Sequence, residues 1–155
     1  MTRFSLPRTT VLARLRLTAG EELPGTIFTS DRVQQHEGPE TVLELLNRPE
    51  EFFAFRPDKV EGVLLIAKAH TVSLSVDEPV FPDPARQEAA RWVDMDVVMA
   101  GGTTLSGRAS FEQPDFHQRL LDFLNATRDA FFAVTHDGTT HYVNRAHVLF
   151  ARPRD

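Results

Sequence analysis

The chain has 155 residues, of which 41% are hydrophobic and 25% charged, a balance typical of a soluble globular protein with its own core. The absence of cysteine excludes disulfides, thiolate nucleophiles and cysteine-ligated zinc, and the net charge of −5 disfavours nucleic acid as a partner. No segment approaches the ~20 apolar residues that span a membrane. Residues 1–8 lack the apolar stretch of a signal peptide, so we expect a cytoplasmic protein without a membrane partner.

The first part of the chain predicts five short strands, over residues 11–17, 23–28, 52–55, 63–66 and 68–74. The first strand is representative, because its apolar positions alternate with Arg14 and Arg16, the two-residue period of a half-buried strand. A short helix fits between the second and third strands. We expect Gly38 to be its N-cap and Asn47 to close it in the left-handed conformation.

A proline-rich stretch separates this part from the next. Pro79, Pro82 and Pro84 fall within it, and since proline cannot donate to a sheet ladder, we expect an extended connector. The predicted organisation is an N-terminal arm, a first repeat, a linker and a second repeat, over residues 1–10, 11–76, 77–90 and 91–152.

The second part predicts the same elements in the same order. The first strand is expected over residues 93–97, and a return strand follows the Gly101-Gly102 turn. Three more strands are expected over residues 131–136, 139–143 and 145–150. Asp115 followed by Gln118 is a capping-box pattern for the helix. Asp137-Gly138 is a strong signal for a two-residue hairpin turn.

Several short motifs recur along the chain, at an offset that drifts only from 102 − 20 = 82 to 147 − 70 = 77. The matching residues are Leu17/Met99, Gly20/Gly102, Leu23/Leu105, Gly25/Gly107, Asn47/Asn125, Phe52/Phe131, Ala69/Ala146 and His70/His147. This pattern predicts a tandem duplication of one small module. The predicted fold is mainly β with short helices, as two tandem five-stranded small barrels or bent sheets. We expect them to pack as a pseudo-two-fold pair, because one module alone would struggle to hide its apolar faces.

Two of these motifs resemble those of Sm-like proteins. The first Sm-like motif matches the spacing Leu17-x-x-Gly20-x-x-Leu23-x-Gly25 and its recurrence from Met99, and the second resembles residues 143–148. The resemblance implies an uncharacterised bacterial domain family of Sm-like shape, and it implies a fold rather than an activity. Gln34-Gln35 replace the Met-Asn of the base-binding pocket in such proteins. An RNA-binding Sm-like protein is therefore our second hypothesis.

The C-terminal histidines are the candidates for a metal site. If Asp137-Gly138 forms a two-residue turn, His136 and His141 lie on one sheet face, and with Asp137 or His147 they could ligate a divalent metal. A metal-dependent enzyme is the third hypothesis. The first module has no counterpart of His136 or His141, so we favour a structural role and expect no cofactor.

His70 and His147 occupy matching positions at the kink before the last strand of each module. We expect a ring nitrogen of each to bond a backbone carbonyl and fix the kink. The alternative is that the two histidines meet across the pseudo-two-fold as a pH-sensitive contact.

The phenylalanine pairs are the candidates for an interaction surface. Adjacent strand residues point to opposite faces, so one member of each pair, Phe52-Phe53 and Phe131-Phe132, needs a second apolar layer. The inter-module interface, the helix or a partner protein could supply that layer. No paired acid and base, nucleophile elbow or phosphate loop appears in the sequence. Our leading hypothesis is a non-enzymatic module that binds another protein or self-assembles as a homo-oligomer.

Overall fold

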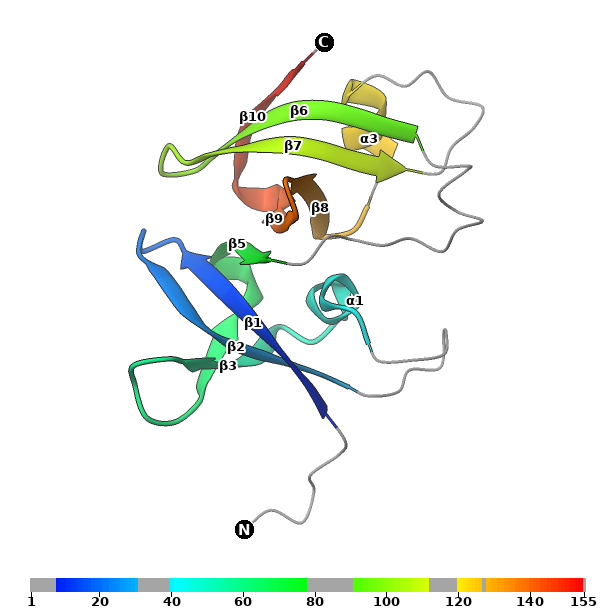
Figure 1. Cartoon of the computed structure of the whole chain (residues 1–155). Coiled ribbons are helices and arrows are strands. Elements are labelled where there is room, and N and C mark those ends of the chain that lie inside the picture. The colour runs from blue at the N-terminus through cyan, green and yellow to red at the C-terminus, as the bar shows by residue number, and fades with distance from the viewer. Residues whose placement is uncertain (1–7, 31–39, 78–90, 112–119, 127, 155) are drawn as a thin grey trace.

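The computed structural model describes residues 8–30, 40–77, 91–111, 120–126 and 128–154. The strands are β1 (Arg8–Leu17), β2 (Glu22–Ser30), β3 (Phe52–Pro57), β4 (Leu64–Ala67), β5 (Thr71–Val76), β6 (Arg91–Met99), β7 (Thr104–Phe111), β8 (Phe131–His136), β9 (Thr139–Asn144) and β10 (Val148–Pro153). The helices are α1 (Val42–Asn47) and α3 (Leu120–Ala126), with short 3₁₀ turns η1 (Lys68–His70) and η2 (Arg145–His147). All these strands form one antiparallel sheet in the order β10-β6-β7-β8-β9-β5-β1-β2-β3-β4. Figure 1 shows β1, β2, β3, β5 and α1 in its lower part and β6 to β10 with α3 in its upper part.

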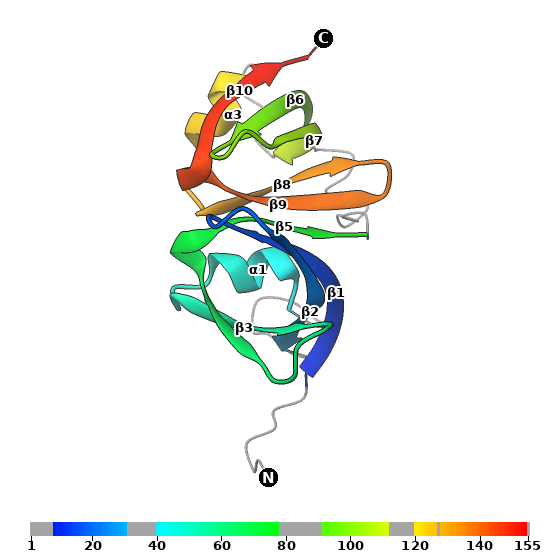
Figure 2. The same cartoon turned by 90° about the vertical axis from the view of Figure 1, so that its left-hand side faces the viewer.

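This single sheet corrects the expected fold. The mainly β class is confirmed, but the prediction of two separate barrels packed as a pseudo-two-fold pair is wrong. We call β1 to β5 with α1 the N-terminal half, and β6 to β10 with α3 the C-terminal half. The halves merge where β5 pairs with β9, which we call the joint (Figure 2). A two-fold axis relating the halves would pair the same strand of each half with its counterpart. Here the fifth strand of the N-terminal half, β5, pairs with the fourth strand of the C-terminal half, β9. Merging the halves removes one exposed strand edge from each, which is the physical reason for one sheet.

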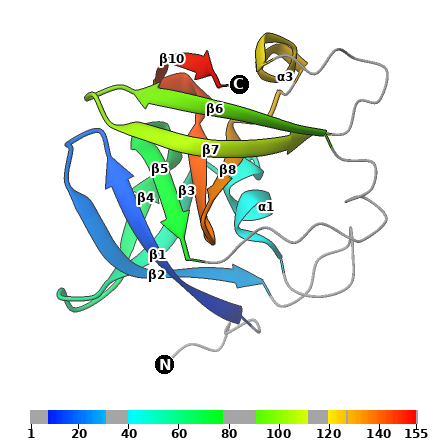
Figure 3. The same cartoon turned by 45° about the horizontal axis from the view of Figure 1, so that its top comes forward.

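The strand order is the same in both halves. The N-terminal half runs β5-β1-β2-β3-β4 and the C-terminal half runs β10-β6-β7-β8-β9. The helix α1 lies against β8 of the other half, and α3 lies against β6 of its own half (Figure 3). Within the described residues, the sheet therefore ends at β4 on one side and at β10 on the other.

Local sequence explains the strands well. In β1, Ala13 and Leu15 are buried while Arg14 and Arg16 are only partly covered, which confirms the two-residue period. At Gly25 in β2 an added Cβ would meet the backbone oxygen of Arg56 and the ring of Phe55. The matching Gly107 in β7 is crowded in the same way by the backbone of Thr135. Glycine is needed at both positions because a neighbouring strand crosses closely.

The start of α1 differs from the prediction. Thr41, not Gly38, is the N-cap, and it forms a capping box with Glu44. The Thr41 hydroxyl accepts from the Glu44 N–H at 3.1 Å, and the Glu44 carboxylate accepts from the Thr41 N–H at 2.7 Å. Gly38, Asp115, Gln118, Gln34-Gln35 and residues 78–90 lie outside the described residues.

The end of α1 differs too. Arg48 is the C-cap, in an extended conformation with φ of −65°, and Asn47 is the last helical residue. The prediction of a left-handed Asn47 is therefore wrong. Its side chain is used elsewhere, because it reaches the backbone of the other half.

Candidate interaction surface

Apolar side chains cross the joint in both directions. Phe131 and Tyr142 belong to the C-terminal half, yet they are buried in the hydrophobic cluster of the N-terminal half. Val72 of β5 is buried in the hydrophobic cluster of the C-terminal half. The pairing of β5 with β9 places Leu74 opposite Tyr142, so the exchange is centred on the joint. The two hydrophobic cores are thereby completed by each other's residues.

Polar groups tie α1 to the other half. The Asn47 side chain donates to the carbonyl of Phe131 at 3.1 Å and accepts from the Phe131 N–H at 2.8 Å. Both groups are partly buried, where an unpaired backbone group is costly. Asn47 thus completes the backbone hydrogen bonding of the first residue of β8.

Asn144 forms a second polar tie, which the sequence analysis missed. Its side chain is buried, donates to the carbonyls of Lys68 at 3.1 Å and Thr71 at 2.9 Å, and accepts from the Ala146 N–H at 2.9 Å. The signal that could have found it is an asparagine directly before a tight turn, where it caps the turn locally.

Lys68 is another residue that the sequence analysis missed. Its ammonium donates to the carbonyls of Leu45 at 2.9 Å and Arg48 at 3.0 Å at the end of α1. Burial, followed by the nearby positive charge of Arg48, lowers the pKa of Lys68 from its ordinary value. In the C-terminal half, Arg145 at the first residue of η2 donates to the carbonyl of Leu124 at 2.8 Å.

The structure places the duplicated histidines at the two 3₁₀ turns. His147 donates from Nε2 to the carbonyl of Ala69 at 2.7 Å. A ring nitrogen of His147 bonds a backbone carbonyl, but that carbonyl lies in η1 of the other half and not at the kink of His147 itself, where we expected it. His70 is exposed. One histidine contact across the joint therefore runs from η2 to η1.

Two further histidines, His136 and His141, lie in the β8–β9 hairpin as predicted, while His36 and His117 lie outside the described residues. His136 lies opposite Thr139 and His141 lies opposite Val134, and Asp137 occupies the turn with φ of 49°. Nδ1 of His141 is 2.6 Å from the Ser75 hydroxyl across the joint. Burial, and then the charges of Arg14 and His136, lower the pKa of His141.

These histidines do not converge on a metal site in the described part of the chain. His136 pairs with Asp137 at 3.1 Å, His141 contacts β5, and His147 contacts η1. No group of three or more histidine, aspartate or glutamate side chains that could hold a metal ion occurs among the described residues.

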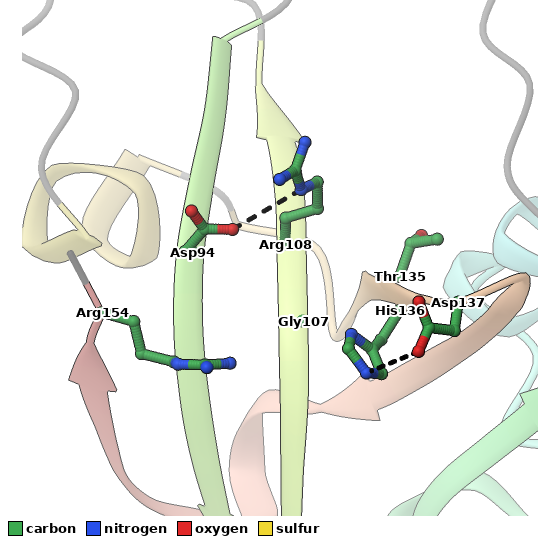
Figure 4. A pocket seen from close by; sticks show the side chains of 7 residues that line it. All are labelled: Asp94, Gly107, Arg108, Thr135, His136, Asp137 and Arg154. Carbon is green, nitrogen blue, oxygen red and sulfur yellow. Dashed lines mark ion pairs between the residues drawn. The ribbon is translucent and has the colours of Figure 1, made fainter.

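A pocket of about 470 Å³ lies beside β7, the β8–β9 turn and the end of β10. It is lined by Asp94, Gly107, Arg108, Thr135, His136, Asp137 and Arg154 (Figure 4). Arg108 and Asp94 form an ion pair at 3.5 Å, and His136 faces Asp137. These charged side chains are exposed, and the third cation of the lining, Arg154, pairs at 3.7 Å with Asp96 outside the pocket.

The most distinctive surface lies at the two ends of the sheet. At one end, large apolar side chains on β3, β4 and the residue before β4 are exposed, and we call them the β4 patch: Phe52, Val63, Leu64 and Leu65. At the other end, two such side chains of β10 are exposed, and we call them the β10 patch: Leu149 and Phe150. An edge strand presents backbone groups that a further strand could pair with, and exposed apolar side chains beside it are typical of interaction sites.

The structure separates the four predicted phenylalanines. Phe53, Phe131 and Phe132 are buried, and only Phe52 is exposed. We expected one member of each phenylalanine pair to need a second apolar layer to pack against. For Phe131, that layer is the hydrophobic core of the N-terminal half. Phe52 is the candidate that remains on the surface.

Comparisons with known proteins give no match: no family model, curated protein or solved structure is similar to this chain. None of the described helices is long and apolar enough to cross a membrane.

Proposed function

We propose that this chain is a non-enzymatic interaction module that binds a polypeptide through the edge strands β4 and β10. The observation that carries the proposal is the placement of exposed apolar side chains. Large apolar groups gather in the β4 patch and the β10 patch, at the two ends of the described sheet.

Edge strands suit this role because a partner strand can extend the sheet. Backbone hydrogen bonds would supply part of the affinity, and apolar side chains beside the edge would supply specificity and more affinity. Natural proteins usually blunt such edges with charges or proline. In β10 the residues that would hinder pairing with another strand, Arg152 and Pro153, come only at the end of the strand. β4 has the sequence Leu-Leu-Ile-Ala and contains neither a charged residue nor proline.

The proposal is tested with a photoreactive phenylalanine analogue placed at single exposed positions. Leu65 and Leu149 report on the two patches, and Leu12 is the matched control, because it is an exposed leucine on the inner strand β1. The full chain carrying each substitution is irradiated in the cells that make it. Adducts are resolved by mass on a denaturing gel.

A discrete polypeptide adduct at Leu65 or Leu149, with none at Leu12, supports the proposal. Equal yields at all three positions, or no polypeptide adduct at either patch, overturn it. Nucleic acid that co-purifies with the chain and crosslinks at the patches would instead favour the RNA-binding hypothesis and overturn ours.

A further inference from the structure

We infer that the partner of each patch is a second copy of this chain, bound head to tail, with β10 of one molecule pairing with β4 of the next. This inference rests on the proposed function, and it names the occupant of the two edges. The joint inside each molecule is the template for the contact between molecules.

The strand order provides the first argument. The joint pairs the fourth strand along the C-terminal half, β9, with the fifth strand along the N-terminal half, β5. In the part of the chain that the structure describes, the free edges of the sheet are the remaining strands of the same kinds, β4 and β10. Each molecule therefore has a counterpart of each strand of the joint at an end of its sheet. β4 corresponds to β9, and β10 corresponds to β5.

The register of the two halves matches as well. Leu15 lies opposite Leu74 in the N-terminal half, and Val97 lies opposite Ala151 in the C-terminal half. A register shift follows at the first residues of β5 and of β10. Since the edges have the same local geometry, β10 is shaped to receive a strand as β5 does.

Apolar burial provides the second argument. The three side chains that cross the joint are nearly covered: Phe131 is 1% exposed, Tyr142 7% and Val72 2%. The residues at the same register positions at the two ends of the sheet are Phe52 on β3, Leu65 on β4 and Leu149 on β10.

These three residues are 58%, 73% and 62% exposed, respectively. The side chains that the joint hides are therefore matched, one for one, by large apolar side chains that a single molecule leaves in solvent. We call the contact between molecules that repeats the joint the copied joint. It would remove from water two of the four side chains of the β4 patch and one of the two of the β10 patch.

Two polar contacts of the joint have sequence counterparts at the free edges. Asn47 bonds the backbone of Phe131, and the motif match pairs Asn47 with the exposed Asn125. His147 bonds the carbonyl of Ala69, and the motif match pairs these residues with His70 and Ala146. In the copied joint, Asn125 of one molecule would bond the Phe52 backbone of the next. His70 of that next molecule would bond the Ala146 carbonyl of the first.

The template also predicts the register. Leu74 opposite Tyr142 becomes Ala151 opposite Leu65, and Ser75 opposite His141 becomes Arg152 opposite Leu64. Asn144 has Ala67 at its matching position, so the copied contact lacks that buried tie. The contact between molecules is therefore weaker than the joint and reversible.

A head-to-tail contact of unlike edges does not stop at a dimer. It produces a closed ring when the rotation per molecule closes, and an open filament when it does not. A molecule with one edge blocked can only terminate such an assembly.

The test uses two edge-blocked variants of the full chain. Phe52→Lys with Leu65→Lys blocks β4, and Leu149→Lys with Phe150→Lys blocks β10; all four side chains are exposed, so the fold is retained. Leu12→Lys is the matched control. Circular dichroism verifies folding, and mass is measured by size-exclusion chromatography with light scattering over a range of concentrations.

We expect the unmodified chain and Leu12→Lys to exceed the 17.5 kDa of one molecule as concentration rises. Each blocked variant alone should remain at 17.5 kDa, and an equal mixture of the two should form a 2 × 17.5 = 35 kDa dimer. An unmodified chain that stays monomeric overturns the inference. So does a blocked variant that dimerises alone, or a mixture that stays monomeric.

A disulfide test checks the register independently, because the chain has no cysteine of its own. Ala151→Cys in one preparation should crosslink to Leu65→Cys in the other on mild oxidation, while Leu12→Cys should not. Failure to crosslink above the Leu12→Cys level overturns the register. If the purified chain is monomeric but the patches still crosslink to another polypeptide in cells, the inference fails and the proposed function stands.

Discussion

Asn47 and Phe131 are joined by a reciprocal pair of hydrogen bonds. The side-chain amide of Asn47 bonds both the N–H and the carbonyl of Phe131, as the backbone of a neighbouring strand residue would. The amide donates to the Phe131 carbonyl at 3.1 Å and accepts from the Phe131 N–H at 2.8 Å. The end of α1 is therefore fixed to the first residue of β8 in the other half.

Replacing Asn47 should weaken the contact between the two halves. We expect Asn47→Ala to lower the free energy of unfolding by about 1–3 kcal/mol, because two partly buried backbone groups lose their partner. Urea unfolding followed by circular dichroism measures the change. Asn125→Ala in a β10-blocked background is the control, with an expected change within about 0.5 kcal/mol because Asn125 is exposed there. Equal losses from both substitutions would contradict the role of Asn47.

Phe131 and Phe52 should differ sharply although they occupy matching positions. Phe131→Ala is expected to cost about 3–5 kcal/mol, since it opens a cavity in the core of the N-terminal half. Phe52→Ala in the β10-blocked background is expected to change stability by less than about 0.5 kcal/mol, because Phe52 is exposed in the single molecule. Thermal or urea unfolding distinguishes the two. A similar loss of unfolding free energy for both substitutions would contradict the difference in burial between Phe131 and Phe52.

Gly25 should not tolerate a side chain. Gly25→Ala is expected to destabilise the fold by about 1–3 kcal/mol, because the new methyl group would collide with the Arg56 backbone and the Phe55 ring. The control is Thr26→Ala on the same strand, for which we expect less than about 1 kcal/mol. A Gly25→Ala protein as stable as the control would show that β2 and β3 can separate there without cost.

Stability should fall as the solution becomes acidic, through His141. Burial and the charge of Arg14 hold the pKa of His141 below its ordinary value of 6.5 in the folded protein. The unfolded chain therefore takes up a proton more readily, and stability present above pH 6.5 is lost as pH falls toward the lowered value. Asp77 also has a lowered pKa, from 3.8, so it titrates below this window.

Urea midpoints at pH 8 and pH 5.5 measure the effect. The loss between them should be smaller in His141→Gln, which cannot titrate in this range but can still bond Ser75. A variant with the same pH dependence as the unmodified chain would assign the effect to another histidine.

Lys68 should act as a cap for α1. Lys68→Met is expected to cost about 1–3 kcal/mol, because the carbonyls of Leu45 and Arg48 lose their donor. Lys68→Arg should retain part of the stability, since Arg145 makes the corresponding bond in the C-terminal half. Equal destabilisation by the two substitutions would show that the alkyl chain of Lys68, not its charge, is what matters.

The sequence predicted the individual strands and turns better than it predicted which strands pair with each other. The alternation in β1 and the Asp137-Gly138 turn depend on local residues, and both were predicted correctly. Hydrophobic periodicity specifies which face of a strand is buried, but it carries no information about which edge another strand joins. The single sheet was missed for this reason, since β5 and β9 are far apart in the chain.

The same limit applies to individual side chains. Asn47 has a sequence context that fits a helix cap, but its amide bonds a backbone that is 84 residues away. Phe52 and Phe131 begin similar motifs, and only the neighbouring half makes one of them buried. The prediction of Gly38 as N-cap did not consider Thr41, which with Glu44 carries a local signal of its own, a capping box.

The joint between β5 and β9 belongs to one polypeptide, so it forms without an encounter between molecules and does not weaken on dilution. Contacts between β10 and β4 of separate molecules obey mass action. Dilution should therefore release whole chains and never single halves, and every closed assembly should contain an even number of halves. Covalent linkage thus sets the smallest unit that the assembly can gain or lose.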